Sequence, residues 1–231
     1  MSFGTYYQAM IDCIIFDLDG TLVDSEPLCN QAFLNLLPEI SLSVDDLLVR
    51  FRGRKLADIF CEIEAMTGRA LPNNFEAAYR EQVEILFKSS LRAFPDVHDV
   101  LKTIDIKVCI ASSGPPGKIK SALEKTSLDR IFAGRTFSSY DIGKWKPDPG
   151  LFLHAAAQMG TSPEFCLVVE DSPVGIAAAK SAGMMPLQFC DKTSAMDGVE
   201  SFDAYSEFAQ KLSWLSKCQL QKSNHCPAKL I

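Results

Sequence analysis

The stretch CIIFDLDGT, residues 13–21, joins four apolar residues to a short run that holds two aspartates and a glycine. Its apolar part lies in a predicted strand, Asp12–Phe16, which does not alternate with polar residues because both of its faces would be buried. Asp17 and Asp19 would follow the carboxyl end of this strand. Parallel sheets bind their ligands outside the carboxyl ends of their strands, so the stretch predicts a polar site at that edge.

Further strand-like runs follow along the chain, and helical stretches separate them. The predicted strands are Lys107–Ala111, Arg135–Phe137, Phe165–Val169 and Met185–Phe189. Among the predicted helices, one opens at Pro115-Pro116 with Ile119 on its apolar face, one spans Asp148–Met159, and one begins at Pro173 after Ser172 as its N-cap. This alternation is expected of a parallel sheet covered by helices on both faces. The sequence therefore predicts an α/β fold, a doubly wound parallel sheet, with an all-helical cap inserted into it.

The insertion lies between the first two strands, which are about ninety residues apart, far more than a crossover needs. Ser43 and Asp46 form a predicted capping box that opens one helix, and Leu56–Met66 and Asn74–Phe87 carry apolar residues at helical spacing. The predicted division is a core of residues 1–25 and 93–217, a helical cap of residues 26–92 and a polar C-terminal tail of residues 218–231.

The two aspartates of the first stretch suit phosphoryl transfer. Asp17 can attack phosphorus and form an aspartyl-phosphate, which splits one hard hydrolysis into two easier steps. Asp19 can protonate the leaving oxygen and then take a proton from the attacking water. An Asp-rich turn is the structural alternative for this pair.

Other polar groups follow the later strands. Ser112, with Ser113 and Gly114, offers a hydroxyl and backbone N–H groups that suit phosphoryl oxygens. Lys146, in the run KWKPDP of residues 144–149, could neutralise phosphate charge, with Lys144 as the competing candidate.

An acidic pair, Glu170 and Asp171, follows the strand Phe165–Val169. Mg²⁺ prefers oxygen ligands, and Asp171 with Asp17 and a backbone carbonyl would supply them. Carboxylates that converge on one strand edge repel one another unless a cation holds them, so the pattern requires a metal ion.

These motifs in this order resemble the haloacid dehalogenase superfamily, within it the capped subgroup that contains β-phosphoglucomutase. The resemblance implies Mg²⁺-dependent phosphatase chemistry beneath a cap. The implied catalytic residues are Asp17, Asp19, Ser112 and Lys146. The implied metal ligands are the carboxylates of Asp17 and Asp171 and the backbone oxygen of Asp19, with Glu170 acting directly or through water.

The predicted cap carries RFRGRK, residues 50–55, the densest basic run of the chain. In capped relatives this segment reaches into the site with a glycine at its tip, which would be Gly53. Arg52 and Lys55 are then candidates for substrate binding, together with Ser113 and Gly114 in the core. Such positive charge suits a substrate with a second anion, such as the carboxylate of a sugar acid.

At the level of subfamily, the chain resembles bacterial 6-phosphogluconate phosphatases. The likeness rests on the basic tract of the cap, on Tyr140-Asp141-Ile142 and on residues 144–149. It implies a small phosphorylated sugar or sugar acid, similar to 6-phosphogluconate, as the substrate. A solvated cap face is the alternative explanation for the basic tract.

Two other functions remain open at this point. A sugar phosphomutase would use the same core, but Cys29 stands where β-phosphoglucomutase has a histidine, and a cysteine cannot play the same part in proton relay. A catalytically silent regulatory binding protein is the other alternative. Metal-free dehalogenation is disfavoured by the second aspartate of the motif and by the acidic pair.

Bulk composition limits the partners. The net charge of −6 disfavours nucleic acid. The apolar runs are far shorter than the roughly 20 residues that cross a bilayer, and the first ten residues show no targeting signal. We therefore expect a cytoplasmic enzyme, a monomer or weak homodimer, whose partner is a small-molecule phosphate ester.

Overall fold

The computed structural model describes residues 11–223, with side chains for residues 11–215. The strands are β1 (Cys13–Phe16), β2 (Lys107–Ser112), β3 (Thr136–Ser138), β4 (Cys166–Glu170), β5 (Met185–Phe189) and β6 (Glu200–Phe202). The helices are α1 (Glu26–Leu36), α2 (Val44–Phe51), α3 (Leu56–Thr67), α4 (Phe75–Ser90), α5 (Val97–Thr103), α6 (Pro116–Lys125), α7 (Ser139–Ile142), α8 (Gly150–Gln158), α9 (Pro173–Ser181) and α10 (Phe208–Ser223). Short 3₁₀ turns cover 163–165, 192–194 and 205–207.

The strands form one parallel sheet in the order β3-β2-β1-β4-β5-β6. β1 is central, with β2 on one side and β4 on the other, so the chain reverses its direction of winding around β1. Such a reversal opens a crevice at the carboxyl ends of the central strands. The predicted doubly wound sheet is confirmed.

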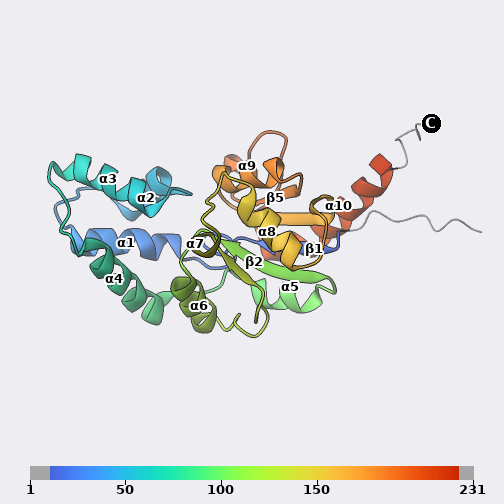
Figure 1. The fold of residues 1–231 in the computed structure, drawn as a ribbon, viewed down its shortest axis with the longest axis horizontal. Coiled ribbons are helices and arrows are strands. Elements are labelled where there is room, and N and C mark those ends of the chain that lie inside the picture. The colour runs from blue at the N-terminus through green and yellow to red at the C-terminus, as the bar shows by residue number, and fades with distance from the viewer. Residues whose placement is uncertain (1–10, 224–231) are drawn as a thin grey trace, which may run out of the picture.

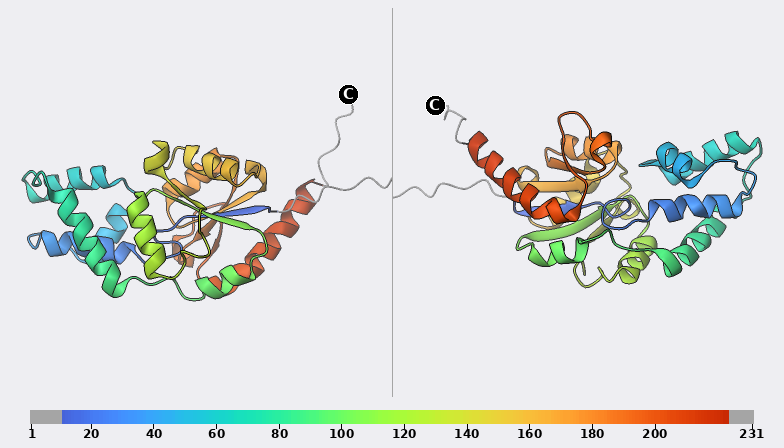
Figure 2. Two further views of the ribbon diagram at one scale, coloured as in Figure 1. Left: turned by 60° about the horizontal axis from the view of Figure 1, so that its bottom comes forward. Right: turned by 180° about the vertical axis from the view of Figure 1, so that it is seen from behind.

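Two hydrophobic clusters fill the space on the two faces of the sheet. Alternate residues of β1 divide between them: Cys13 and Ile15 pack with α8 and α9, whereas Ile14 and Phe16 pack with α5, α6 and α10. Figures 1 and 2 show these helices on opposite sides of the strands. Both faces of β1 are thus buried, as its continuous apolar run predicts.

Four helices, α1 to α4, lie together at one end of the molecule, beyond the carboxyl ends of the strands (Figure 1). The predicted capping box is present at α2, because Ser43 accepts from the backbone N–H of Asp46 and the Asp46 side chain accepts from that of Ser43. Two chain segments that run side by side join these helices to the sheet. The Asp24 N–H donates to the carbonyl of Arg92, and the Phe94 N–H donates to that of Leu22.

Three expectations about the elements need correction. β6 was missed, since a three-residue strand in a polar segment carries no periodic signal. α8 begins at Gly150 rather than Asp148, because the Asp148 side chain accepts from the Gly150 N–H and precedes the helix. α10 continues past residue 217 to Ser223, into the predicted tail, where neither glycine nor proline interrupts the chain. Residues 224–231 lie outside the described part.

No helix within the described residues is both long and apolar enough to span a membrane.

Candidate active site

Asp17 lies at the carboxyl end of β1, and its backbone N–H donates to the carbonyl of Val169 in β4. Its side chain is buried and accepts a hydrogen bond from the ammonium of Lys146. The same ammonium donates to Glu170 Oε1 at 2.7 Å. The sheet thus brings together three predicted residues that are far apart in the sequence.

Burial dominates the electrostatics of Asp17. It raises the pKa of the carboxyl well above its usual range, the Lys146 ammonium opposes this rise, and the carboxylates of Glu170 and Asp19 add to it. Lys146 alone therefore does not neutralise the carboxylates that lie together at the strand ends. A further cation bound there would offset the remaining negative charge.

Asp171 shows where that cation would lie. Its Oδ1 accepts from the Thr21 hydroxyl at 3.3 Å, whereas its buried Oδ2 has no hydrogen-bond partner among the described residues. Burial raises the pKa of Asp171 well above its ordinary value, and Glu170 is the largest of the neighbouring charges that add to the rise. Gly20 has φ +76°, and a Cβ there would lie only 2.8 Å from Oδ2. The turn after β1 therefore needs a glycine to pass this carboxylate.

Within residues 11–215, Asp17, Glu170 and Asp171 form the one cluster of potential metal ligands in which an atom of each lies within 4.8 Å of the others. All of these atoms are carboxylate oxygens, the donors that Mg²⁺ prefers. Asp171 Oδ2, which accepts no hydrogen bond from the described residues, has the capacity for one more ligand contact. The residues present therefore fit a hard divalent cation.

Glu170 differs from its neighbours in that both of its oxygens already have partners. Oε1 accepts from Lys146, and Oε2 accepts from the backbone N–H of Ser172 at 2.6 Å and from its hydroxyl at 2.9 Å. Ser172 in turn accepts from the Gly175 N–H and caps α9, as predicted. Glu170 thus fixes both the lysine and the loop that carries Asp171.

Asp19 faces the pocket two residues after Asp17. Its Oδ1 accepts from the Ser25 hydroxyl at 2.5 Å and from the Lys118 ammonium at 2.7 Å. Burial alone would raise the pKa of Asp19, but the ammonium and the hydroxyl more than offset it, and the pKa lies below its usual value. Asp19 is therefore held as a charged carboxylate beside a lysine.

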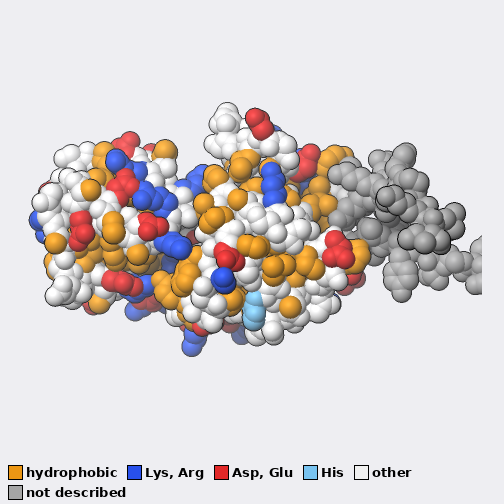
Figure 3. All heavy atoms as spheres, turned by 45° about the horizontal axis from the view of Figure 1, so that its top comes forward, with side chains coloured by type: hydrophobic (Ala, Val, Ile, Leu, Met, Phe, Trp, Pro, Cys, Tyr) orange, Lys and Arg blue, Asp and Glu red, His pale blue; other side chains and the backbone are white. Residues whose placement is uncertain are grey.

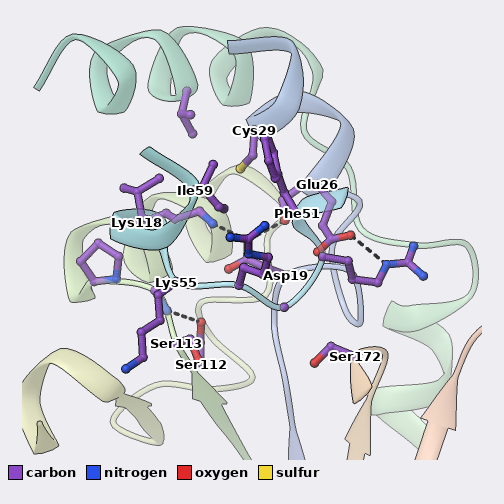
Figure 4. A pocket seen from close by; sticks show the side chains of 18 of the residues that line it. Asp19, Glu26, Cys29, Phe51, Lys55, Ile59, Ser112, Ser113, Lys118 and Ser172 are labelled. Atoms are coloured by element: carbon purple, nitrogen blue, oxygen red, sulfur yellow. Dashed lines mark hydrogen bonds and ion pairs between the residues drawn. The ribbon is translucent and has the colours of Figure 1, made fainter. Parts of the chain in front are cut away.

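Lys118 is a pocket residue that the sequence analysis missed. It lies in the first turn of α6, next to the predicted apolar residue Ile119. A lysine is unfavourable there, because the amino end of a helix carries partial positive charge. A lysine at this unfavourable position was the signal in the sequence that could have marked Lys118 as a functional residue. Its contact with the carboxylate of Asp19 explains why a lysine is present there. Figure 4 shows Lys118 and Asp19 around the same pocket.

Ser112 ends β2, two residues after Ile110, which pairs with Phe16 of β1, and it is buried. Its hydroxyl accepts from the backbone N–H of Gly114 at 3.0 Å. A Cβ on Gly114 would lie 3.6 Å from Asp19 Oδ2, which places this loop against the second aspartate. Ser112, Ser113 and Gly114 all line the pocket, as the sequence predicts.

Of the two competing lysines, only Lys146 lies at the site. Its side chain is 4% exposed, whereas the Lys144 side chain is 55% exposed and donates to Asp148 at 3.2 Å. Lys144 therefore braces the loop that precedes α8.

The basic tract of residues 50–55 divides into two sets. Arg50 and Arg54 both pair with Glu62 of α3 and so belong to the helical layer itself. Arg52 instead pairs with Glu26 at 3.3 Å and reaches Asp171 Oδ2 at 3.6 Å. Figure 3 shows Lys and Arg side chains gathered on the part of the helical layer that borders the sheet. Two of the tract's three arginines thus pair within the helical layer, and only Arg52 reaches a proposed metal ligand.

Gly53 marks the closest approach of this tract to the strand ends. It has φ +72°, and a Cβ there would lie 2.9 Å from Val174 and 3.0 Å from Ser172. Only glycine fits between the tract and the start of α9 without a shift of one of them.

Lys55 differs from the other basic residues of the pocket. Within residues 11–215 it is the pocket-lining cation that has no carboxylate partner, and its ammonium lies 5.4 Å from the centre of the Trp145 ring. Trp145 packs edge-on against Tyr140, which contacts Arg80 of α4. Lys55 and these aromatic rings form one wall of the pocket.

The pocket between the strand ends and the helical layer has a volume of about 860 Å³. Core residues such as Asp19 and Ser112 line it from one side, and residues of the helical layer such as Cys29, Phe51 and Ile59 line it from the other (Figure 4). It has ample room for a phosphorylated sugar.

Fold and site together define a doubly wound α/β enzyme whose buried acidic residues and lysine meet at a strand edge under a helical layer. The chain belongs to the haloacid dehalogenase-like hydrolase family, whose model matches residues 11–183. The predicted family is confirmed.

Two relatives are informative. The chain is 37% identical over 186 residues to the 6-phosphogluconate phosphatase of Escherichia coli, covering 79% of this chain and 84% of that protein. It is 30% identical over 181 residues to a phosphorylated carbohydrates phosphatase of Thermotoga maritima, covering 75% and 82%. Together with the family, these relatives make the chain a phosphoric monoester hydrolase.

Solved structures agree on the fold. A haloacid dehalogenase-like protein from Agrobacterium tumefaciens superposes with a TM-score of 0.78 at 29% identity, covering 89% of this chain and 99% of that one. A putative β-phosphoglucomutase from Thermotoga maritima superposes with a TM-score of 0.72 at 24% identity, covering 88% and 99%.

Proposed function

We propose that this chain is a Mg²⁺-dependent phosphatase that hydrolyses a small phosphorylated sugar or sugar acid through an aspartyl-phosphate. The observation that carries the proposal is the position of Asp17, buried at the central strand end between Lys146 and the acidic cluster. The relatives named above act, by their names, on phosphorylated carbohydrates and on 6-phosphogluconate, which supports the same substrate class.

The chemistry would proceed in two displacements. A carboxylate oxygen of Asp17 attacks phosphorus, and the bond from phosphorus to the ester oxygen breaks. Asp19, which rests as a carboxylate beside Lys118, must take up a proton when substrate binds and then donates it to the departing alcohol. Water then attacks the phosphorus of the aspartyl-phosphate while Asp19 takes its proton. The bond from phosphorus to Asp17 breaks, and inorganic phosphate leaves.

Lys146 and the residues at the end of β2 would hold the phosphoryl group during both steps. The Lys146 ammonium already lies against Asp17 and would share its charge with the phosphoryl oxygens. The hydroxyl of Ser112 and the backbone N–H of Ser113 would bind the same oxygens from β2, and Gly114, whose N–H donates to Ser112, would hold that hydroxyl in place. Glu170 would keep Lys146 in place, since it bonds the lysine and the Ser172 loop together.

Mg²⁺ would be held by the carboxylates of Asp17 and Asp171 and by the backbone oxygen of Asp19. When bound it would offset the charge of the carboxylates and the phosphate. Glu170 would act on this site indirectly, because both of its oxygens already accept hydrogen bonds from the protein.

We assign residues 26–92 to a cap that closes over the strand ends. The paired segments around Asp24 and Arg92 would serve as its hinge, since they are the crossing points between the helices and the sheet. Closure would exclude water from the pocket before the first displacement. The enzyme would act on its substrate as a cytoplasmic monomer or weak homodimer.

The structure favours Lys55 over Arg52 as the residue that binds a second anion of the substrate. Lys55 lines the pocket without a carboxylate partner among the described residues, whereas Arg52 pairs with Glu26 and Asp171. A free ammonium on an aromatic wall suits a carboxylate at the far end of a phosphorylated sugar acid.

Cys29 favours hydrolysis over phosphate transfer to a second sugar. It lines the pocket from α1, and burial raises the pKa of its thiol above the ordinary value. A thiol that stays protonated cannot accept a proton from an attacking sugar hydroxyl.

A panel of phosphorylated sugars and sugar acids, assayed for phosphate release, tests this function. We expect turnover of several members, the highest kcat/KM with a phosphorylated sugar acid, and no conversion of one sugar phosphate to its isomer. Isomer formation without phosphate release would show a phosphomutase, and the absence of any turnover would refute the enzyme.

A further inference from the structure

Arg52 connects the helical layer to the proposed metal site. Its Nε lies 3.3 Å from Glu26 Oε2 at the start of α1 and 3.6 Å from Asp171 Oδ2. The latter oxygen is the buried atom that has no hydrogen-bond partner among the described residues. A side chain of the cap thus supplies positive charge to the carboxylate oxygen that is open to a metal ion.

We propose that Arg52 is an internal counter-ion that competes with Mg²⁺ for Asp171. The inference rests on the proposed function, because it takes Asp171 as a metal ligand. In the conformation described here the guanidinium partly neutralises Asp171. A bound divalent cation repels this guanidinium, so the two cations cannot both lie close to the same oxygen.

The surroundings of Arg52 suit this role. Gly53 lies so close to Ser172 and Val174 that the tract is seated against the loop that carries Asp171. Glu26, at the point where the chain enters the cap, accepts a hydrogen bond from the same Nε that faces Asp171. The 43% exposed Arg52 side chain can move toward solvent without unfolding anything.

The contact links metal binding to the position of the cap. An Arg52 that pairs with Asp171 holds residues 50–55 against the core. Since coupling is reciprocal, a metal that displaces Arg52 must also loosen this cap contact. Metal loading would therefore free the guanidinium and ease the opening through which substrate enters.

The Mg²⁺ dissociation constant of the full chain, measured by titration calorimetry without substrate, tests the proposal. Arg52→Met keeps much of the length of the side chain and removes its charge. We expect it to bind Mg²⁺ about fivefold more tightly than the unaltered chain, the scale of one partly exposed ion pair. Arg50→Met is the matched control, because Arg50 belongs to the same tract but pairs with Glu62.

The possible outcomes distinguish failure of the counter-ion role from failure of the proposed metal site. Tighter binding in Arg52→Met and no change in Arg50→Met support the counter-ion. Equal or weaker Mg²⁺ binding in Arg52→Met overturns the counter-ion role and leaves the metal site intact. Equal tightening in both variants also overturns it, because the effect is then one of overall positive charge. No Mg²⁺ binding by the unaltered chain overturns both this inference and the proposed metal dependence. Arg52→Gln, with a neutral polar side chain, repeats the measurement if the methionine variant does not fold.

Discussion

The strand-end site and the basic tract of the helical layer are both short and densely charged, yet their charged side chains pair with different kinds of partner. At the strand ends Asp17, Lys146 and Glu170 are buried and pair with one another across the sheet. In the tract Arg50 and Arg54 are exposed and share one glutamate of the neighbouring helix. The topology of the sheet dictates the first set of contacts, whereas the second depends on local side-chain choices. Loss of a strand-end group should therefore cost far more than loss of a tract residue.

The largest effect should come from Asp17→Asn, which removes the nucleophile. An amide cannot form the acyl phosphate, so we expect kcat to fall by about 10⁴-fold or more. Steady-state phosphate release measures the loss, and circular dichroism with thermal melting checks that the variant folds. A folded variant that retains even a tenth of the activity would show that Asp17 is not the nucleophile.

Removal of the metal tests the acidic cluster as a whole. After dialysis against EDTA we expect activity to fall by about a thousandfold and to return on addition of Mg²⁺, because the cluster is then left without its cation. Excess Ca²⁺, whose coordination is looser and larger, should inhibit the restored enzyme. Full activity in metal-free buffer would remove the metal from the proposal.

Lys146→Met compares the site with its own flanking loop. We expect kcat to fall by about a hundredfold or more, the usual cost of one lost group that stabilises the transition state. Lys144→Met is the matched control, since Lys144 is two residues away and exposed. It should change kcat by less than about twofold. Equal losses in both variants would place the effect in the loop rather than in the ammonium at Asp17.

Much of this site could be predicted from the sequence, because parallel strands impose their own geometry. Once Cys13–Phe16 and Cys166–Glu170 are recognised as neighbouring strands, Asp17 and Asp171 must meet at one edge. Proline and serine signals likewise placed the start of α9 correctly. Charged residues that follow strands are therefore read reliably from a single sequence.

What the sequence did not predict depends on tertiary pairing. Lys118 was missed because its partner, Asp19, is far away in the chain and no strand precedes the lysine directly. In the sequence Arg52 and Lys55 are equivalent candidates. In the structure Arg52 pairs with Glu26 and Asp171, whereas Lys55 lies against a tryptophan ring. The sequence of β6 and the sequence at the end of α10 carry no periodic pattern of apolar residues from which either could be predicted.

The smallest effect, and the one that most sharpens the contrast, is expected for Lys55→Met. If Lys55 binds the second anion of the substrate, KM for 6-phosphogluconate should rise about tenfold, equivalent to roughly 1.4 kcal/mol of binding free energy. KM for p-nitrophenyl phosphate should not change, because that ester has no distal carboxylate. Arg50→Met again serves as the control, with neither value altered. A rise with both esters would mean that Lys55 shapes the pocket through Trp145 rather than recognising an anion, and the tract would then contribute structure and not specificity.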